Sequence, residues 1–424
     1  MSRANVHRFS LGAVAVAAVA SATAVGCERV SYYSLTGGGG DAVETTTSPA
    51  TTTGTGTTTG TGAPVTRGAV LEAVGVCAAS LYGEAAEATA KLRDATVAAA
   101  ADPSKKEDAR AAWNEAIDRW QQAEMLRLGP AGPATTPGGK DLRDLVYSWP
   151  LVSRCIVEQT IVAKSYDDDG FFSTALLNMR GLAAAEYLLF YEGADNACSA
   201  AASINSTGAW AALSEAELAN RKADYASAVA ADVAKQAKVI ADTWSASGGD
   251  FAGELARAGK SGSLFETDQL AMNALTDGLY YLDSEVKDLK LGRPLGLVEC
   301  PTPTCLDLVE SRYARRSRDH IKSNLIGLRR IFAGCDEGGN VGLDDLLTAL
   351  GAGALAATLT ADIEAAIQAA DALPSSDVAV SVVEDDAKVL ALHAAIKKIT
   401  DALKTQFATV LDVELPQKIE GDND

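Results

Sequence analysis

The sequence contains very little histidine. Only three of its 424 residues are of this type, at His7, His320 and His393. Catalytic zinc normally takes at least three protein ligands, with imidazole prominent among them. Neither His320 nor His393 occurs in a His-x-x-Glu or His-Glu-x-x-His pattern, so the usual zinc hydrolase motifs are missing. The sequence also lacks the Gly-x-Ser-x-Gly turn that carries the nucleophile of many serine hydrolases.

Proline and strand-like alternation are scarce as well. No proline occurs between Leu151 and Arg293, and only Val378 to Val383 could alternate in the manner of a strand. Alanine dominates instead, and it is the best helix former, whereas proline interrupts helices. These features predict an all-α fold. The expected helices cover residues 67–100, 103–128, 141–164, 174–192, 214–246, 264–290, 305–333, 343–371 and 384–413.

Basic residues are outnumbered by acidic ones. The chain has 37 Lys and Arg against 56 Asp and Glu, a formal net charge of −19. Removal of residues 1–26 would take away Arg3 and Arg8, which leaves 35 − 56 = −21. This balance argues against nucleic acid as a partner and against docking on anionic lipid headgroups. It is compatible with cation binding, but solubility alone also explains such a charge.

No Cys-x-x-C pair and no Cys/His cluster occurs, so neither a zinc site nor a redox motif is expected. Apart from Cys27 the chain has six cysteines. If the chain is exported, as its N-terminus indicates below, this even number suggests up to three disulfides, and the sequence does not determine which cysteines pair. Cys300 and Cys305 either close a small loop or make two links outward. The cysteines other than Cys27 are Cys77, Cys155, Cys198, Cys300, Cys305 and Cys335.

The N-terminus has the features of an export signal. A basic start is followed by an apolar segment, Leu11 to Ala24, that is too short for a comfortable membrane span. The segment ends in Ala24-Val25-Gly26-Cys27, which resembles a bacterial lipobox. We therefore expect residues 1–26 to be a lipoprotein signal peptide and Cys27 to be the lipidated anchor in the cell envelope. Simple secretory cleavage near the same place is the alternative.

Residues 27–66 offer almost nothing apolar to bury. Gly37 to Gly40 is followed by a Thr-rich and Gly-rich stretch that reaches Gly62. Such composition does not form a packed core and is typical of flexible linkers. We expect a tether that holds a folded body away from the membrane, either on the periplasmic side of the outer membrane or on the cell surface.

Two helical stripes have the same spacing and indicate an internal duplication. Residues on one face of a helix recur every three or four positions. The expected architecture is two related four-helix-bundle-like halves, residues 67–246 and residues 247–424. The first stripe is Trp113, Ile117, Trp120, Glu124 and Leu128, and the second is Tyr313, Ser317, His320, Asn324 and Leu328.

Glu186 is the only charged residue between Arg180 and Glu192. One helical turn away from it lie only apolar residues, including Ala183 and Leu189. A carboxylate on such a face must be paired, protonated or bound to a cation, because a stranded buried charge costs several kcal/mol or more.

The segment around Glu186 resembles the Gly-x-His-x-x-Glu signature of imelysin-like proteins. Gly181 and Glu186 are in register with that motif, but Ala183 stands at the histidine position. The resemblance implies an all-α duplicated bundle in the bacterial envelope, in a family first described as peptidases and associated with iron acquisition. Further similar segments are Ala112-Trp113 to Pro130, Trp149-Pro150, Glu310-Ser311 with Ser317, Asn324-Leu325, Gly327-Leu328, Phe332 with Gly334, and Asn340 to Leu347.

The candidate site is a polar pocket at the junction of the two halves. Glu186 and Glu124 are the expected oxygen ligands for iron or another divalent cation, since a hard cation needs several oxygens. Arg180 could pair with Glu186 or with an anionic ligand. Ser317 and His320 would line the other side. The alternative is structural: Glu186 satisfied by an arginine or a helix N-terminus, and His320 hydrogen-bonded within the core.

The leading functional hypothesis is a non-enzymatic binding or accessory role in the acquisition of iron or another metal, together with envelope iron-uptake proteins. A metal-dependent peptidase of the imelysin type is one alternative, which the missing histidine at Ala183 weakens. A surface interaction protein with a vestigial pocket is the other.

Overall fold

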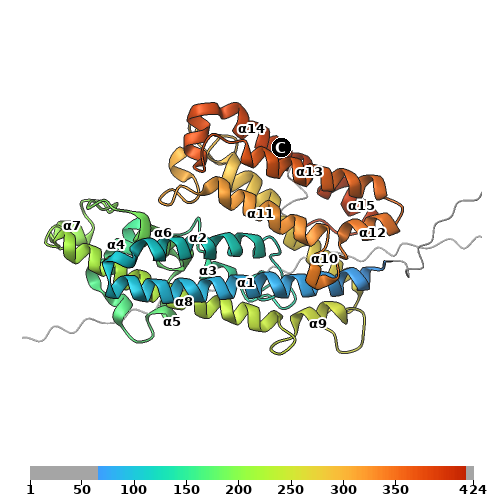
Figure 1. The fold of residues 1–424 in the computed structure, drawn as a ribbon, viewed down its shortest axis with the longest axis horizontal. Coiled ribbons are helices and arrows are strands. Elements are labelled where there is room, and N and C mark those ends of the chain that lie inside the picture. The colour runs from blue at the N-terminus through green and yellow to red at the C-terminus, as the bar shows by residue number, and fades with distance from the viewer. Residues whose placement is uncertain (1–64, 417–424) are drawn as a thin grey trace, which may run out of the picture. The chain divides into compact units, whose positions relative to one another are not determined.

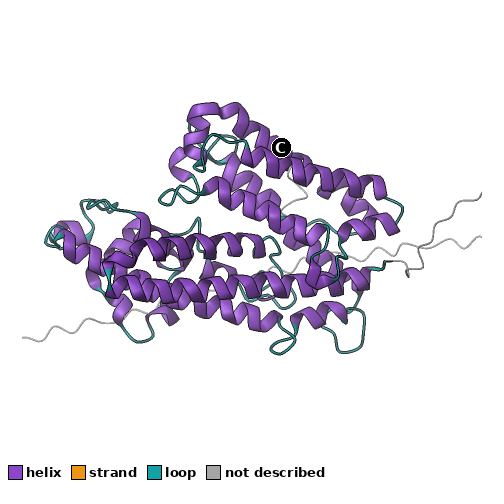
Figure 2. Ribbon diagram, in the orientation of Figure 1, coloured by secondary structure: helices purple, strands orange, loops and turns teal. Residues whose placement is uncertain are grey.

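The computed structural model describes residues 65–416, and all regular structure in this range is helical (Figure 2). The expected all-α class is therefore confirmed, and Val378 to Val383 is also helical. The described residues form one compact unit. The predictions for the signal peptide, for Cys27 and for nearly all of the tether lie outside the described residues.

One group of helices forms around the long helix α1 (Arg67–Ala101). Helix α1 lies along α2 (Lys106–Ala123) and α8 (Glu215–Trp244), and α6 (Gly181–Phe190) packs against both α2 and α8 (Figure 1). Large aromatic side chains fill the interior. The rings of Tyr82 and Trp244 stack with their centroids 5.8 Å apart, and Trp113 and Trp120 are fully buried. Burial of such side chains is the main stabilising contribution in this group.

Helix α1 is long and apolar enough to cross a membrane by length and composition alone. However, more than half of its most apolar window is buried within the fold, as expected for a core helix of a bundle.

The second group contains α11 (Ser317–Phe332), α13 (Gly353–Asp371), α14 (Val378–Ala402) and η5 (Leu282–Gly292), which is a π-helix. Helix α11 joins the two groups because it packs against α2 as well as against α13. The approach is close at Gly327, where an added Cβ would lie 2.2 Å from the carbonyl oxygen of Gln122. Only glycine fits at this crossing.

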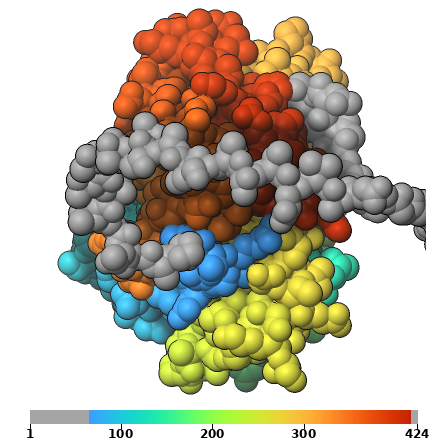
Figure 3. All heavy atoms as spheres, turned by 90° about the vertical axis from the view of Figure 1, so that its right-hand side faces the viewer, coloured from blue at the N-terminus to red at the C-terminus, as the bar shows by residue number. Residues whose placement is uncertain are grey.

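The start of α1 lies beside α9 (Phe251–Ala256). Figure 3 shows this end of α1, in blue, next to the yellow segment that contains α9. At this end Arg67 donates a hydrogen bond of 2.9 Å to the carbonyl oxygen of Leu411.

The remaining α-helices are short. They are α3 (Arg143–Val146), α4 (Arg154–Ala163), α5 (Phe171–Thr174), α7 (Ser203–Ser206), α9 (Phe251–Ala256), α10 (Asp268–Leu279), α12 (Leu343–Ala349) and α15 (Ala408–Leu411).

Two of the expected helices begin with a side-chain cap. The Asp102 side chain accepts from the backbone N–H of Ser104, with Pro103 at the first helical position. Ser214 Oγ accepts from the backbone N–H of Glu217, which is one of the two hydrogen bonds of a capping box. Side-chain acceptors of this kind satisfy N–H groups that have no partner in the first turn.

Several of the expected helices are shorter or divided. The helix at 141–164 is split into α3 and α4, because Pro150 cannot continue a helix. The helix at 343–371 is interrupted at Gly351, which has a φ of +82°. The helix at 305–333 begins only at Ser317, and the preceding loop contributes to the site described below.

The internal duplication and the boundary at residues 246/247 stay predictions. Each of the two groups contains four main helices, but α9 and α10, which follow the expected boundary, contact α1 of the first group.

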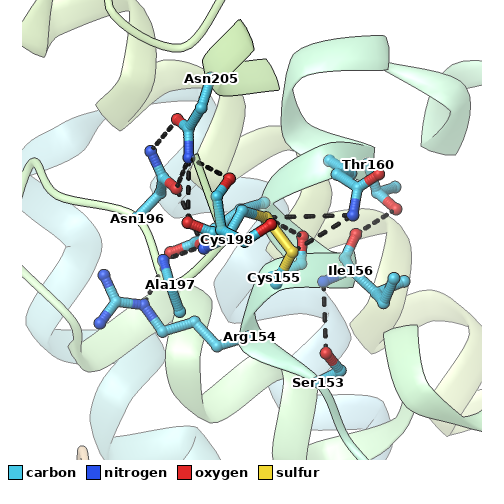
Figure 4. The surroundings of a disulfide bond; sticks show 12 residues. Ser153, Arg154, Cys155, Ile156, Thr160, Asn196, Ala197, Cys198 and Asn205 are labelled. Atoms are coloured by element: carbon cyan, nitrogen blue, oxygen red, sulfur yellow. Dashed lines mark hydrogen bonds and ion pairs between the residues drawn. A yellow bond between two sulfur atoms is a disulfide. The ribbon is translucent and has the colours of Figure 1, made fainter. Parts of the chain in front are cut away.

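The cysteines form two disulfides among the described residues. Cys155–Cys198 connects α4 to the segment after α6 (Figure 4), and Cys300–Cys305 closes a small loop, which was one of the two expected arrangements. Cys77 and Cys335 are buried free thiols. The sequence allowed up to three disulfides, and the structure has two.

Candidate functional site

The position of Glu186 is set by the way α6 begins. Gly181, the first residue of α6, has a φ of +79°, a region that favours glycine. An added Cβ there would lie 3.0 Å from the carbonyl oxygen of Val146. Ser148 Oγ donates a hydrogen bond of 2.6 Å to the carbonyl oxygen of Arg180. The glycine thus lets the start of α6 lie directly against the chain after α3.

Glu186 is buried, with 4% of its surface exposed, and its Oε1 receives three hydrogen bonds. Two come from the backbone N–H groups of Tyr313 and Ala314, at 2.9 and 2.8 Å, and one comes from Ser311 Oγ at 3.2 Å. These donors lie in the loop before α11. The N–H groups of residues 313 and 314 are directed at Glu186, which explains why the helix expected at 305–333 starts late.

The carboxylate of Glu186 has no ion-pair partner among residues 65–416. Burial raises its pKa, and the hydrogen bonds from Ala314, Tyr313 and Ser311, together with nearby His320, offset this effect only in part. The group is therefore a buried acid that hydrogen-bond donors hold in place without neutralising its charge.

A pocket of about 240 Å³ lies beside this carboxylate. Ala183, Glu186 and Tyr187 of α6 form one wall, and the loop that contains Ser311 and Tyr313 forms another. All hydrogen bonds described for the carboxylate go to Oε1, so Oε2 is the oxygen that remains for a ligand. The other lining residues are Trp149, Pro150, Val152, Arg154, Val157, Arg293, Asp307, Leu308, Val309 and Arg312.

Three arginines line the pocket, and two of them are already paired. Arg154 contacts Glu158 at 2.7 Å and Asp195 at 2.8 Å, and Arg293 pairs with Glu299. Arg312 is exposed and donates to the carbonyl oxygen of Asp307 at 3.2 Å. In the part of the chain that the structure describes, Arg312 has no carboxylate partner. The pocket thus offers one buried unpaired carboxylate, that of Glu186, together with the exposed carboxylate of Asp307 and the unpaired guanidinium of Arg312.

A second set of buried charges lies between α2, α11 and η5, and we call it the central cluster. It consists of Glu124, Glu310, Arg143, Lys290 and His320, all of which are buried. Arg143 Nε lies 3.1 Å from Glu124 Oε2. Lys290 Nζ lies 3.1 Å from Glu310 and 3.6 Å from Glu124. Each carboxylate of this cluster therefore has a permanent cation beside it.

Neutral side chains supply further hydrogen bonds to the central cluster, although Glu310 Oε2 and both ring nitrogens of His320 have no hydrogen-bond partner among the described residues. Tyr147 donates to Glu310 at 2.6 Å, and Tyr281 donates to Glu124 at 2.7 Å. Lys290 also donates to Gln121 Oε1 at 2.6 Å and to Asn324 Oδ1 at 2.8 Å. Burial alone would raise the pKa of Glu310, but Lys290 and His320 outweigh it and lower that pKa to about 2.

The structure separates the residues that the sequence placed in one site. Glu124 belongs to the central cluster and does not line the pocket beside Glu186. Arg180 pairs with Asp232 at 2.5 Å rather than with Glu186. Ser317 Oγ accepts from the backbone N–H of Val378 at 2.7 Å, at the start of α14.

His320 lies in the central cluster, where its Nδ1 is 3.4 Å from Glu310 Oε1. The fully buried ring has Trp113 on one side, with centroids 6.0 Å apart. His320 also acts to lower the pKa of the Glu186 carboxyl.

Several residues of both sites were not predicted. Ser311 and Arg312 were hidden within an expected helix, and Tyr313 was noted only as part of the second stripe. Two of the three donors to Glu186 are backbone N–H groups, which no side-chain pattern marks. Lys290 stood at the end of an expected helix, where a lysine is usually solvated. Glu310-Ser311 was noted only as part of the family resemblance.

No group of three His, Cys, Asp or Glu side chains between residues 65 and 416 is arranged to hold a metal ion. Glu186 supplies one free oxygen and the exposed Asp307 lies at the same pocket, whereas a bare hard cation takes six or more oxygen ligands. The pocket as it stands fits a ligand that brings its own donor atoms.

Comparison with known proteins agrees with this architecture. Iron-regulated protein A of Synechococcus elongatus is 26% identical over 230 residues, which cover 54% of this chain and 52% of that protein. The chain thus matches about half the length of this curated relative.

Two solved structures share the fold. A crystal structure assigned as an iron-regulated protein A precursor from Parabacteroides distasonis has a TM-score of 0.61 at 17% identity, with 83% of this chain and 96% of that chain covered. An imelysin-like protein from Psychrobacter arcticum has a TM-score of 0.62 at 18% identity, with 83% and 98% covered. The model of the Imelysin family, peptidase M75, matches residues 78–406. Since this match spans most of the sequence, the chain belongs to the imelysin family.

Proposed function

We propose that this protein binds iron, presented as a chelate, in the pocket beside Glu186, and that it serves iron acquisition without catalysis. The observation that carries the proposal is the state of Glu186: a buried carboxylate with three donors on one oxygen, no ion-pair partner among the described residues, and a pocket beside the other oxygen. Two of the similar proteins are named as iron-regulated, which supports iron as the cargo.

A chelate fits the charges of the pocket better than a bare ion. Iron(III) held by an organic polycarboxylate presents a metal that accepts an oxygen ligand and carboxylates that carry negative charge. Glu186 Oε2 would contact the metal, and Arg312 would contact a carboxylate of the chelator. Guanidinium groups are well suited to carboxylates because both are planar and bind through paired hydrogen bonds.

The burial of Glu186 favours such binding. Transfer of an unpaired carboxylate from water into the protein is costly, and part of that cost is recovered when a cation arrives. The binding of a metal is therefore more favourable in free energy at Glu186 than at an exposed carboxylate, because water screens the attraction between the charges less in the pocket.

The same proposal places the protein in the bacterial envelope, with Cys27 as the lipid anchor and residues 27–66 as a spacer. A lipid anchor of two or more acyl chains gives stable attachment. Envelope iron-uptake proteins would then be its partners.

The proposal is tested by equilibrium dialysis of the purified full-length chain against iron(III) citrate, with iron(II) and zinc salts in parallel. We expect the wild type to bind one equivalent of iron and Glu186→Gln to bind it at least tenfold more weakly. Glu364→Gln is the matched control, because Glu364 is an exposed partner of Arg329 on α13, and it should bind as the wild type does.

If no form of the chain binds iron or zinc, the role of a surface interaction protein replaces the proposal. Cleavage of casein by the wild type that disappears in Glu186→Gln would favour the metal-dependent peptidase instead.

A further inference from the structure

A second cavity, of about 460 Å³, lies between α1, α6, α8 and the turn after α6. It shares no lining residue with the pocket beside Glu186. Its volume falls in the range of roughly 300–1,000 Å³ that small-molecule sites occupy. Apolar side chains form much of its surface, including Ala99, Leu188, Leu189 and Leu218.

Lys222 of α8 lines this cavity although only 7% of its surface is exposed. Its Nζ donates to the carbonyl oxygens of Tyr191 and Gly193, at 3.0 and 3.3 Å. It also lies 5.2 and 5.1 Å from the ring centroids of Tyr187 and Tyr191. An ammonium group has three N–H donors, so the two carbonyls leave one donor available.

No carboxylate lies within ion-pair distance of Lys222 in the described part of the chain. The nearest acids are engaged elsewhere: Glu158 pairs with Arg154 at 2.7 Å, and Glu192 pairs with Lys106 at 2.9 Å and with Arg110. Glu215, also at the cavity, is exposed. A buried cation without an anion is costly, and here the missing counter-charge would sit in the cavity.

We propose that this cavity binds a small apolar carboxylate, whose head pairs with Lys222 and whose tail lies against Leu188, Leu189 and Leu218. The ligand would be a medium-chain alkyl carboxylate, which has one anionic group and a flexible apolar body. The buried head-group contact supplies specificity for charge, and removal of the tail from water supplies affinity.

The pKa of Lys222 predicts how the affinity for the ligand depends on pH. Burial, the largest cause, and the charges of Lys106 and Arg154 lower this pKa to about 8, although Glu158 and Glu192 act in the opposite direction. Only the protonated amine attracts a carboxylate. We therefore expect affinity to be retained below about pH 8 and to fall above it, with the midpoint shifted upward because the bound anion stabilises the ammonium form.

The test is isothermal titration calorimetry of the full-length chain with octanoate, octanol and octylamine at pH 7. We expect octanoate to bind with one-to-one stoichiometry, octanol to bind at least tenfold more weakly, and octylamine not to bind. Lys222→Met should weaken octanoate binding at least tenfold. Lys238→Met is the matched control, since Lys238 is exposed on the same helix and pairs with Asp242.

Lys222 also holds two carbonyls at the end of α6, so Lys222→Met could fail to fold. Ala223→Phe is therefore the second variant: Ala223 lines the cavity, and a phenyl ring would fill it while the amine stays. It should abolish octanoate binding. The proposal is overturned if octanoate does not bind the wild type, if octanol binds equally well, or if Ala223→Phe binds octanoate as the wild type does.

Discussion

Glu186 and Glu310 are both buried carboxylates in the interior of this protein, but their surroundings differ in kind. Glu310 has Lys290 at 3.1 Å and a tyrosine hydroxyl at 2.6 Å, and it lines neither of the two cavities described above. Glu186 has only hydrogen-bond donors, with no ion-pair partner in residues 65–416, and a pocket beside it. Burial of a carboxylate therefore does not by itself indicate a binding site. Glu310, whose charge is neutralised by Lys290, contributes to stability. Glu186, which has no counter-charge among the described residues, is the carboxylate suited to a ligand.

The largest effect is expected at the cation of the central cluster. Lys290→Met removes the ammonium that lies beside both Glu310 and Glu124, and it leaves two buried carboxylates with Arg143 as the remaining permanent cation. Loss of one member of a buried ion pair costs about 3–5 kcal/mol. Urea unfolding of the variant should show this loss in the free energy of unfolding. A loss below about 1 kcal/mol would mean that the cluster is not neutralised as described.

Glu310 should contribute stability that depends on pH. Its folded-state pKa of about 2 lies below the pKa of ~4.3 of an unfolded glutamate. The stabilisation is therefore fully present above the unfolded-state pKa and is lost as the pH falls towards the folded-state pKa of about 2. Glu310→Gln should cost about 3 kcal/mol at pH 7. The difference from the wild type should shrink between about pH 4.3 and pH 2. A difference that stays constant over this range would contradict the assignment.

Glu186 should behave in the opposite way. Its folded-state pKa is raised, so its ionised form opposes folding at neutral pH, and the penalty is relieved as the pH falls through that raised pKa. Glu186→Gln should therefore be neutral or stabilising at pH 7, within about 1 kcal/mol, because the amide oxygen still accepts from Tyr313 and Ala314. The difference from the wild type should vanish below about pH 4.3. Thermal unfolding at several pH values measures this, and a clear destabilisation at pH 7 would place Glu186 with Glu310 as a structural group.

A small effect on metal affinity is expected where the family motif is restored. Ala183→His places an imidazole three residues before Glu186 on the same face of α6 and at the wall of the pocket. With only two protein ligands the site stays incomplete, so Zn²⁺ affinity should rise on the order of tenfold, equivalent to ~1.4 kcal/mol. Calorimetric titration with Zn²⁺ checks this, with Ala183→Gln as the control of similar size. An equal gain in both variants would show that the imidazole is not a ligand.

The difference between the two carboxylates also explains what could be predicted from the sequence. Glu186 was found because a charge on an apolar helix face is a local signal. Its donors were missed because Tyr313 and Ala314 contribute backbone N–H groups, which every residue except proline carries. These groups also delay the start of α11, so the expected helix boundary was least accurate at the site itself, as is common where function constrains the chain.

The central cluster was missed for a related reason. Lys290 lies in a π-helix, in which the extra residue per turn changes the side chains that face the interior, and no pattern with the period of an α-helix detects this. Glu124 and Arg180 were expected beside Glu186, but Arg143 and Asp232 pair with them instead. The all-α class needed no such detail, since alanine content and the absence of proline determine it over long segments.

The most direct test of the account is an anomalous-difference crystal structure of the chain with iron(III) citrate, measured at the iron absorption edge for wild type and for Glu186→Gln. The account predicts one iron peak within coordination distance of Glu186 Oε2 in the wild type, with a chelator carboxylate towards Arg312, and no peak at this place in the variant. An iron peak that persists in Glu186→Gln, or one that lies only in the central cluster beside Glu310, would contradict it.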